Sequence, residues 1–418
     1  MEKNKKKELI EILKERGYVK DLTDEETIKR LVNGPPMTFY LGIDPTADSL
    51  HIGHFFALTL FKWLQDFGHH GIILIGGATA LIGDPTGKSD MRKMLTKEQV
   101  QHNKNEVKEL IKRFINTDGD NKAIIVDNAD WICDKTYVDF MRDVGVFFNV
   151  NTMLAADCYK KRQQAGGLTF LEMGYMLMQA FDFIHLNKEF NCTLQIGGSD
   201  QWANILAGVD LSRKMSLKNN EPNPNLAGWT CPLLIKADGE KMGKTASGTL
   251  WVSREKTTVF DFYQAWMNSF DEDVERSLTF FTRMEVEEIK AICKKDIREA
   301  KKLLAFEVTK LVHGEENALA AKKAAEELFS GSISATNVPT INVISKNLNK
   351  NIIDFLVDIK FLTSKSEAKR LLAQNGLRLN KELLTDPSKI ITESDFKDNS
   401  ILLQKGKKTF LKVVLTEK

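Results

Sequence analysis

The sequence predicts an α/β protein in which a doubly wound, Rossmann-like parallel sheet is followed by an α-helical region and a small α+β unit. Nearly continuous apolar runs alternate with helical patterns over the first 250 residues, as in parallel sheets with helical crossovers. Residues 257–330 have helical periodicity and few glycines. From Ser345 onward the chain has 15 Lys and Arg against 9 Asp and Glu, a net of +6 on a chain whose total is +2. A basic end of this kind favours an anionic partner, although a solvated charged surface has the same composition.

These changes of character divide the chain into five parts. We predict an N-terminal helical segment at 1–34, the Rossmann-like domain at 35–250, the helical domain at 251–335, a linker at 336–349 and the terminal unit at 350–418. The linker lies in the Ser/Thr/Asn-rich stretch GSISATNVPTINVISKNLN, a composition that is typical of connecting segments.

The strands of the first domain are expected where short apolar runs occur. They are MTFYLGI at 37–43, GIILIGG at 71–77, KAIIVDN at 122–128 and CTLQIGG at 192–198, and a further strand begins CPLLIKADGEKMGKTASGTLW at 231–251. Helical patterns lie between them, from near Ser49 to Gly68 and at 96–115, 136–148 and 168–187. The terminal unit is expected to form two helices around the turn LTSKS, and then a strand and turn at NGLRLN.

Several classes of protein are excluded by composition. No run of eighteen apolar residues occurs, so no membrane-spanning helix is expected, and the charged start MEKNKKKELIEILKER is unlike a signal or transit peptide. The chain contains five widely spaced cysteines and no CxxC pair: Cys133, Cys158, Cys192, Cys231 and Cys293. This pattern indicates reduced thiols in a cytoplasmic protein, without a disulfide framework or a protein-bound metal.

The stretch DPTADSLHIGH, residues 44–54, follows the first expected strand with a turn and two histidines. A helix that starts near Ser49 directs its free N–H groups and its positive dipole end toward a ligand. His51 and His54 share one face of its first turn, where their ring N–H groups can donate to phosphate oxygens. Gly53 has no side chain, so a flat base can lie against the backbone. The alternative is a helix capped by Ser49, in which both histidines are incidental.

A second candidate piece is KMGKT at 241–245. Lys241 and Lys244 flank a glycine and form a cationic arm that can stabilise charge on a leaving pyrophosphate. The alternative is a solvated surface loop.

A third candidate lies within GLTFLEMGYMLMQAFDFIHL, where Tyr175, Gln179 and Asp182 share one face of an otherwise apolar helix. Buried polar groups without partners cost roughly 1–3 kcal/mol each, and a polar ligand would provide those partners. The alternative is a polar stripe that faces water.

The combination of HIGH with KMGKT resembles the class I aminoacyl-tRNA synthetases. YLGIDPTADSLHIGH, LIGDPTGK, GYMLMQAFD, LQIGGSDQW and KMGKTASGTLW, in this order and spacing, resemble the bacterial-type tyrosyl-tRNA synthetases over essentially the whole chain. Gly243 and Thr245 replace the two serines of the broader signature KMSKS, which keeps both lysines and one hydroxyl. The resemblance implies a ligase that activates L-tyrosine with ATP to tyrosyl adenylate and pyrophosphate, and then transfers tyrosyl to the 3′ end of tRNA(Tyr).

The resemblance also implies roles for individual residues. The residues implied for tyrosine are Asp84, Tyr175 and Gln179 at the ammonium group, Tyr40 and Asp182 at the phenol hydroxyl, and Gln201 at the carboxylate. Those implied for ATP are Gly42, Asp44, Gly53, Gly198, Asp200 and Lys244. Those implied for the chemistry at the phosphates are Thr46, His51, His54, Lys88, Arg92, Lys241, Lys244 and Thr245. Magnesium would accompany ATP through its phosphates.

The end of the chain resembles an S4-type RNA-binding module over about 350–418. Lys365, Lys369 and Arg370 would contact RNA phosphates without reading bases, and the alternative is a charged helical hairpin that binds nothing. The helical region 251–330 would face the anticodon side of tRNA. The family is homodimeric, which implies a contact near 131–165, although the apolar stretch VGVFFNVNTML there also fits a core.

Two other functions fit parts of the sequence. The tryptophan-specific relatives share the expected fold, but the pair Tyr40 and Asp182 argues against them because indole has no hydroxyl. A non-catalytic paralogue that only binds RNA would not need both histidines, both motif lysines and the tyrosine pocket.

Overall fold

The computed structural model describes residues 7–86, 92, 94–245, 248–330, 340–406 and 409–416, without the side chains of 244–245, 328–330, 347 and 409. The chain divides by its internal contacts into two units, each described by itself below. The first unit contains residues 1–256 and 275–291, and the second contains 257–274 and 292–418.

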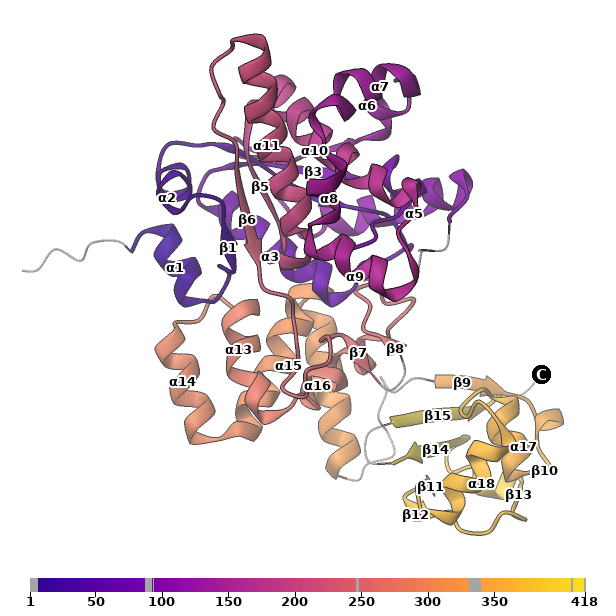
Figure 1. Cartoon of the computed structure of the whole chain (residues 1–418). Helices are drawn as coiled ribbons and strands as arrows, with labels where there is room; N and C mark the ends of the chain where they lie inside the picture. The colour runs from indigo at the N-terminus through magenta and orange to yellow at the C-terminus, as the bar shows by residue number, and fades with distance from the viewer. Residues whose placement is uncertain are drawn as a thin grey trace, which may run out of the picture. The chain divides into compact units, whose positions relative to one another are not determined.

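A six-stranded sheet forms the centre of the first unit (Figure 1). Its strand order is β1 (Asp21–Leu22), β6 (Ala227–Cys231), β5 (Cys192–Gly198), β2 (Thr38–Ile43), β3 (His70–Ile75) and β4 (Ile124–Asp127). The five longer strands pair in parallel, which confirms the predicted α/β class. The edge strand β1 was not predicted, and it pairs with β6 in the antiparallel direction.

The strand expected to begin at Cys231 was misplaced. In the structure β6 ends at Cys231, and all five of its residues are buried. Pro232 follows directly, and it has no N–H for a strand ladder. The chain then leaves the sheet, and the KMGKT segment forms the short hairpin of β7 (Lys244–Thr245) and β8 (Gly248–Thr249).

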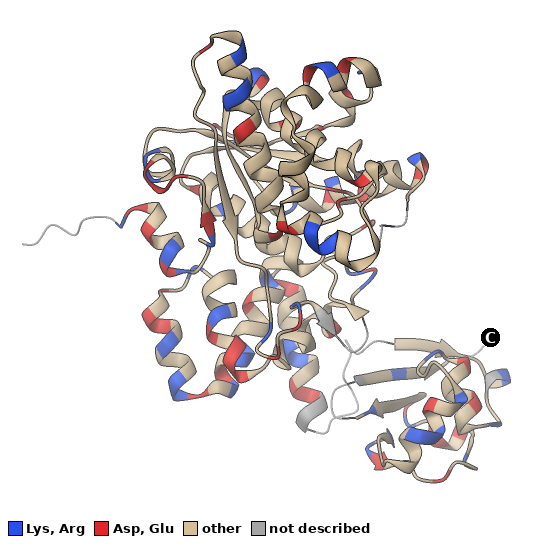
Figure 2. Cartoon of the chain, in the orientation of Figure 1, with Lys and Arg blue, Asp and Glu red and all other residues tan. Residues whose placement is uncertain are grey.

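Helices cover both faces of the sheet, because successive side chains of a strand point in opposite directions. Tyr40 of β2 packs against Phe183 of α10 (Phe170–Phe190), with their ring centroids 5.2 Å apart. Its neighbour Phe39 packs at 4.8 Å against Phe61 of α3 (Ile52–Asp66) on the other face. In Figure 2 most Lys, Arg, Asp and Glu lie on helices and loops, and the strands of this sheet carry few.

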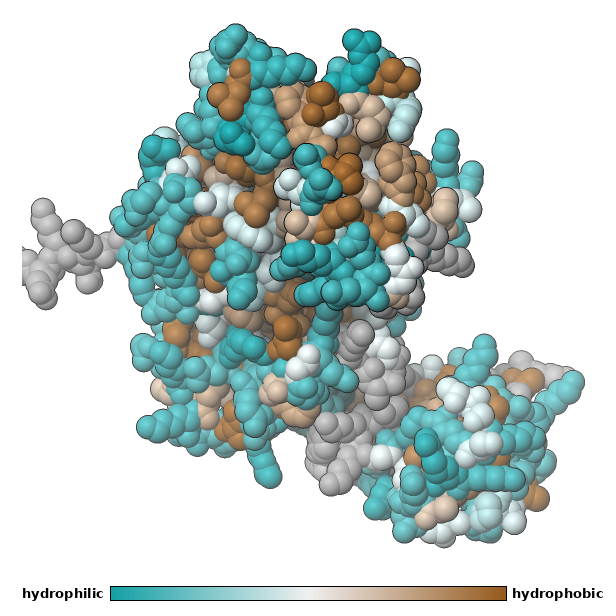
Figure 3. Space-filling model, in the orientation of Figure 1, coloured by the Kyte–Doolittle hydropathy of each residue, from teal (hydrophilic) through white to brown (hydrophobic). Residues whose placement is uncertain are grey.

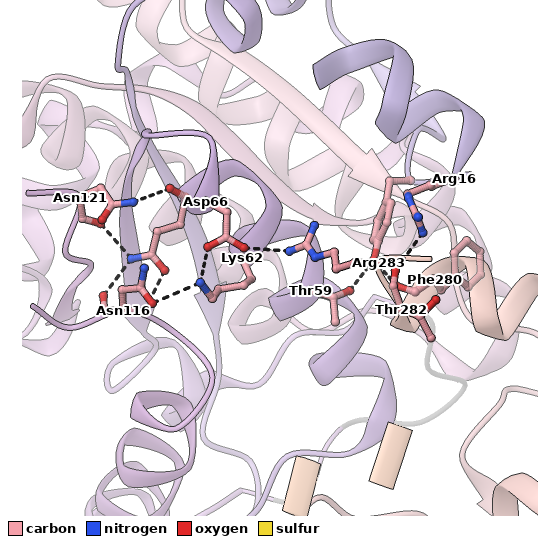
Figure 4. A network of polar contacts seen from close by, with 11 residues as sticks. Arg16, Thr59, Lys62, Asp66, Asn116, Asn121, Phe280, Thr282 and Arg283 are labelled. Carbon is pink, nitrogen blue, oxygen red and sulfur yellow. Dashed lines mark hydrogen bonds and ion pairs between the residues drawn. The ribbon is translucent and has the colours of Figure 1, made fainter. Parts of the chain in front are cut away.

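The C-terminal half of α3 is held by a polar network that we call the α3 anchor (Figure 4). It consists of Arg16, Tyr18, Thr59, Lys62, Gln65, Asp66, Asn116, Asn121, Phe280, Thr282 and Arg283. Arg16, 4% exposed, donates to the carbonyls of Thr279 and Thr282 at 2.7 and 2.9 Å. Arg283 pairs with Asp66 at 3.0 Å and lies 3.3 Å from the ring centroid of Trp63. The anchor thus joins α3 to three segments that are distant from it in the sequence, at 16–18, 116–121 and 280–283.

The second unit contains helices and a separate small sheet. Its complete helices in the helical region are α12 (Val259–Met267), α15 (Ile297–His313) and α16 (Glu315–Ser330), whereas α13 (Asp271–Phe281) and α14 (Val286–Lys295) contribute residues to both units. The sheet has the order β12 (Glu382–Leu383), β11 (Leu377–Leu379), β14 (Ser400–Lys405), β15 (Thr409–Leu415) and β9 (Thr340–Val343).

The small sheet corrects the predicted linker at 336–349. Residues 340–343 form β9, which pairs in parallel with β15, and Val343 is buried in the core beneath the sheet. The two expected helices and the strand are present as α17 (Ile352–Asp358), α18 (Lys365–Ala373) and β11. Among the described residues, no helix is long and apolar enough to cross a membrane.

Candidate active site

A cavity of about 450 Å³ lies at the carboxyl ends of β2, β3 and β5, where parallel α/β sheets generally bind ligands. Every predicted site residue of the first unit whose side chain or glycine backbone is described lines it: Tyr40, Gly42, Asp44, Thr46, His51, Gly53, His54, Asp84, Arg92, Tyr175, Gln179, Asp182, Gly198, Asp200, Gln201 and Lys241. Lys88 and the side chains of Lys244 and Thr245 lie outside the described residues.

The two histidines at the start of α3 differ in their roles. The helix begins at Ile52, and His51, not Ser49, is its N-cap. The Nδ1 atom of His51 accepts from the backbone N–H groups of Gly53 and His54 at 3.1 and 3.2 Å. In the neutral ring the proton is therefore on Nε2, which is the atom that can donate to a ligand.

His54 stacks on His51 with the ring centroids 3.7 Å apart. Burial lowers its pKa to about 3, and the charges of His51 and Arg92 act in the same direction. Its Nδ1 atom is buried without a hydrogen-bond partner among the described residues. His54 is therefore neutral at physiological pH, and it offers a ligand one hydrogen bond and an aromatic face instead of a positive charge.

One end of the cavity is built around Asp182, which is 1% exposed. Its Oδ1 atom accepts from Trp131 Nε1 at 2.8 Å, and its Oδ2 atom accepts from Asn128 Nδ2 at 3.0 Å. Burial raises the pKa of Asp182 to about 8 against the effect of these two bonds. Two other cavity atoms, Tyr40 Oη and Gln195 Oε1, are buried without partners in the part of the chain that the structure describes. This end can accept and donate hydrogen bonds to a ligand hydroxyl.

The other end contains two more carboxylates. Asp44 accepts from Tyr175 Oη at 2.8 Å and from Thr79 Oγ1 at 2.7 Å, and burial raises its pKa to about 6. Asp84 accepts from Gln201 Nε2 at 2.7 Å. Asp44, assigned to ATP by the resemblance, thus bonds directly to Tyr175, which was assigned to the amino acid. Carboxylates and a phenol in this arrangement suit a cationic group such as an ammonium.

Two glycines make room along the lining of the cavity. A Cβ atom at Gly42 would meet nothing within 4 Å, so any side chain there would project into the cavity. A Cβ at Gly198 would lie 2.7 Å from Oδ1 of Asp200. Burial raises the pKa of Asp200, and Lys241, which also lines the cavity, opposes this shift.

Several site residues were missed in the sequence analysis. Thr79, Asn128 and Trp131 hold the cavity carboxylates, and Gln195 lines the wall. Gln195 could have been found as a long polar side chain among the buried apolar residues of CTLQIGG. Asn128 could have been found by its place after a parallel strand. Thr79 and Trp131 gave no signal, because their partners are distant in the sequence.

The residues expected to bind RNA lie on α18 of the second unit. Lys365, Lys369 and Arg370 are exposed. Lys365 forms an ion pair with Asp354 at 2.6 Å, so part of its charge is neutralised within the protein.

Two families match the chain. The family of tRNA synthetases class I (W and Y) matches residues 33–330, and the tyrosine–tRNA ligase SYY-like C-terminal domain matches residues 332–413. The tyrosine–tRNA ligase of Clostridium kluyveri is 50% identical over 97% of this chain and 98% of its own length. That of Clostridium tetani is 48% identical over 97% of this chain and 99% of its own length.

Solved structures give the same result. The C-terminally truncated mitochondrial tyrosyl-tRNA synthetase of Aspergillus nidulans is 30% identical with a TM-score of 0.68, covering 78% of this chain and 95% of its own. The tryptophanyl-tRNA synthetase of Giardia lamblia is 16% identical with a TM-score of 0.54, covering 75% of this chain and 86% of its own, a likeness of fold alone.

Proposed function

The chain belongs to the tyrosine–tRNA ligases within the class I aminoacyl-tRNA synthetases, and from this premise we propose how its cavity joins L-tyrosine to tRNA(Tyr). In the first step the tyrosine carboxylate attacks the α-phosphate of ATP, and the bond to the β-phosphate breaks to release pyrophosphate. In the second step a ribose hydroxyl at the 3′ end of tRNA attacks the tyrosyl carbonyl, and AMP leaves.

The first step needs positioning and electrostatic stabilisation, because the carboxylate is already a nucleophile. We propose that a group of hydroxyl, imidazole and cationic side chains stabilises the leaving phosphates. They are Thr46, His51 through its Nε2 atom, Lys88, Arg92, Lys241, Lys244 and Thr245. His54 and the glycines Gly42, Gly53 and Gly198 would contact the nucleotide, and Asp200 the ribose. Magnesium would come with the ATP phosphates.

The buried pair of Tyr40 and Asp182 carries the assignment of tyrosine as the substrate. A site that hydrogen-bonds a hydroxyl rejects the analogue that lacks it, an effect for which tyrosyl-tRNA synthetases are themselves the usual example. Tyr40 Oη and the Asp182 carboxylate would bind the phenol hydroxyl, which phenylalanine lacks. Asp84, Tyr175, Gln179 and, from its bond to Tyr175, Asp44 would bind the ammonium group, and Gln201 would lie beside the carboxylate.

We also propose that the protein is a homodimer. Apolar side chains are exposed on α7 (Tyr137–Asp143), α8 (Val150–Leu154), the turn between them and the start of α10: Tyr137, Val138, Val146, Val150 and Phe170, each 54–70% exposed. In Figure 3 apolar residues gather on the face where Figure 1 draws α8 and α10. Exposed apolar patches often mark protein interfaces. The proposal predicts a dimer mass in sedimentation equilibrium and a monomer mass for Val146→Asp.

For the second unit we propose RNA contacts. Residues 350–418 would act as an S4-like module through Lys369, Arg370 and, more weakly, Lys365, and the helices of 251–335 would face the anticodon side. We propose a cytoplasmic location, which the free cysteines support because disulfides are rare in reducing compartments.

The test is ATP–pyrophosphate exchange with each of the twenty amino acids, followed by charging of tRNA(Tyr). We expect exchange with tyrosine only and loss of exchange in Lys241→Ala. Exchange with tryptophan instead would contradict the assignment of the pocket. RNA binding without exchange for any amino acid would indicate a paralogue that only binds RNA.

A further inference from the structure

Thr79 and Asn128, to which the proposed reaction gives no role, lie between the two ends of the cavity. Thr79 begins α4 (Thr79–Ile82) and Asn128 follows β4, and they are 2% and 0% exposed. Asn128 Nδ2 donates to Oδ2 of Asp182 at 3.0 Å, and Thr79 Oγ1 donates to Oδ1 of Asp44 at 2.7 Å. Asn128 Nδ2 also donates to Thr79 Oγ1 at 3.1 Å. A continuous chain of hydrogen bonds therefore joins the two carboxylates.

The surrounding groups fix which atom donates and which accepts in every hydrogen bond of this network. The N–H of Ala78 donates to Asn128 Oδ1 at 2.8 Å, so the amide nitrogen must face Asp182 and Thr79. Both amide hydrogens are then in use. Thr79 accepts one of them and has a single hydrogen of its own, which it donates to Asp44. Neither side chain can turn without losing a bond in a buried place.

The backbone beside this chain of hydrogen bonds leaves room for it. A Cβ atom at Gly76 would lie 1.9 Å from Oδ1 of Asp44 and 2.3 Å from Oγ1 of Thr79. Only glycine at this position allows the hydroxyl and the carboxylate to meet. The bond between Thr79 and Asp44 thus depends on a specific residue of the turn after β3.

The two carboxylates also interact electrostatically. The charge of Asp44 is one of the causes that raise the pKa of Asp182, after burial. A cation bound near Asp44 offsets that repulsion and favours the ionised form of both groups. Hydrogen bonds in a connected buried network polarise one another, so a change at Asp44 reaches Asp182 through Thr79 and Asn128.

We propose that Thr79 is a positioning residue that couples the two ends of the cavity, so that binding of the substrate ammonium strengthens recognition of the phenol hydroxyl. The inference rests on the proposed function, because it takes tyrosine as the ligand. It gives the enzyme a means of discriminating against ligands that carry only one of the two groups, beyond what each contact provides alone.

The test compares four ligands: L-tyrosine, L-phenylalanine, 3-(4-hydroxyphenyl)propanoate and 3-phenylpropanoate. Their dissociation constants for the full chain are measured by calorimetry, or by competition with labelled tyrosine where binding is weak. We expect removal of the hydroxyl to weaken binding at least threefold more when the ammonium is present than when it is absent. The coupling ratio is the loss of affinity on removal of the hydroxyl in the presence of the ammonium, divided by the same loss in its absence. Thr79→Val, which has the same shape without the hydroxyl, should reduce this ratio to about one, and Thr79→Ser should restore it.

Thermal unfolding of each variant shows whether it is folded, and Thr79→Ala replaces Thr79→Val if the latter is not. An undiminished ratio in the variant without the hydroxyl would overturn the proposal, because coupling would then pass directly through space. A ratio of one in the unmodified protein would overturn it as well. Failure of the unmodified protein to bind L-tyrosine would contradict the proposed function instead, which keeps the two failures distinct.

Discussion

The two ends of α3 lie in polar environments of opposite kinds. At its C-terminal half, in the α3 anchor, the side chain of Arg16 and the hydroxyl of Tyr18 bind partners within the protein (Figure 4). At its N-terminal end, the cavity contains Tyr40 Oη and His54 Nδ1, which are buried without partners among the described residues. Polar groups that are paired internally stabilise a fold, and buried groups without partners reduce its stability unless a ligand binds them.

The same type of substitution should therefore have opposite effects in the two places. In the anchor it should lower the free energy of unfolding and leave catalysis unchanged. In the cavity it should lower activity and leave stability unchanged or improved, since active sites are commonly built at the expense of stability.

The largest effect is expected for Asp182→Asn. The variant loses the carboxyl group that would accept the phenol hydroxyl, and leaving a buried hydrogen-bonding group without its partner costs about 1–3 kcal/mol. We expect kcat/KM for tyrosine in pyrophosphate exchange to fall about 100-fold, with KM for ATP within about twofold of its original value. A comparable rise in KM for ATP would instead indicate general distortion of the cavity.

The second largest effect is expected for a substitution in the α3 anchor. Arg16→Met removes a buried guanidinium and leaves the carbonyls of Thr279 and Thr282 without their donor. We expect a loss of roughly 2–3 kcal/mol in the free energy of unfolding in urea. Arg30→Met is the matched control, because Arg30 is exposed, and it should change stability by less than about 0.5 kcal/mol. At 25 °C the folded Arg16→Met protein should retain its exchange activity, and loss of activity in the folded state would break the comparison.

The same substitution, tyrosine to phenylalanine, can be made in the α3 anchor and in the cavity. Tyr18 and Tyr40 are both 0% exposed, but Tyr18 Oη bonds to the carbonyl of Phe280 and to Thr59 Oγ1 at 2.8 Å. Tyr18→Phe should cost about 1 kcal/mol of stability with unchanged kinetics. Tyr40→Phe should cost no stability and reduce the preference for tyrosine over phenylalanine about tenfold. Equal stability losses would show that Tyr40 has an internal partner, such as an ordered water.

Local patterns predicted most of the sheet and of the cavity. The apolar runs located β2, β3, β4 and β5, and the turn that follows the first of these strands located the two histidines. These features depend on neighbouring residues, so a single sequence contains them. The family resemblance, not periodicity, supplied the roles of Asp84, Gln201 and Arg92.

What could not be predicted depends on contacts between distant segments. Arg16 binds carbonyls more than 260 residues away, and Asn128 lies 54 residues from Asp182. The two-residue strand β1 has no pattern of its own and exists because it pairs with β6. The alternative interpretation placed the N-cap at Ser49, because serine is a common cap, whereas the structure uses the imidazole of His51.

The smallest effect concerns His69, a buried histidine just beyond the end of α3. Its Nδ1 atom accepts from the N–H of Met37 at 3.3 Å, and its Nε2 atom lies 2.9 Å from the carbonyl of Val32. Burial lowers its pKa. The unfolded chain, with a histidine pKa near 6.5, therefore binds protons that the folded protein does not. The contribution of His69 to stability is present above about pH 6.5 and declines as the pH falls toward its folded pKa.

We expect the unmodified protein to lose up to about 1 kcal/mol of stability from this residue between pH 7 and pH 5.5, as measured by urea unfolding at each pH. His69→Asn should flatten that part of the profile. The remaining slope should include the part due to His54, whose pKa is also lowered by burial. If His69→Asn leaves the slope unchanged, His69 does not contribute, and the acid sensitivity comes from the other histidines whose pKa is lowered by burial, His54 and His185.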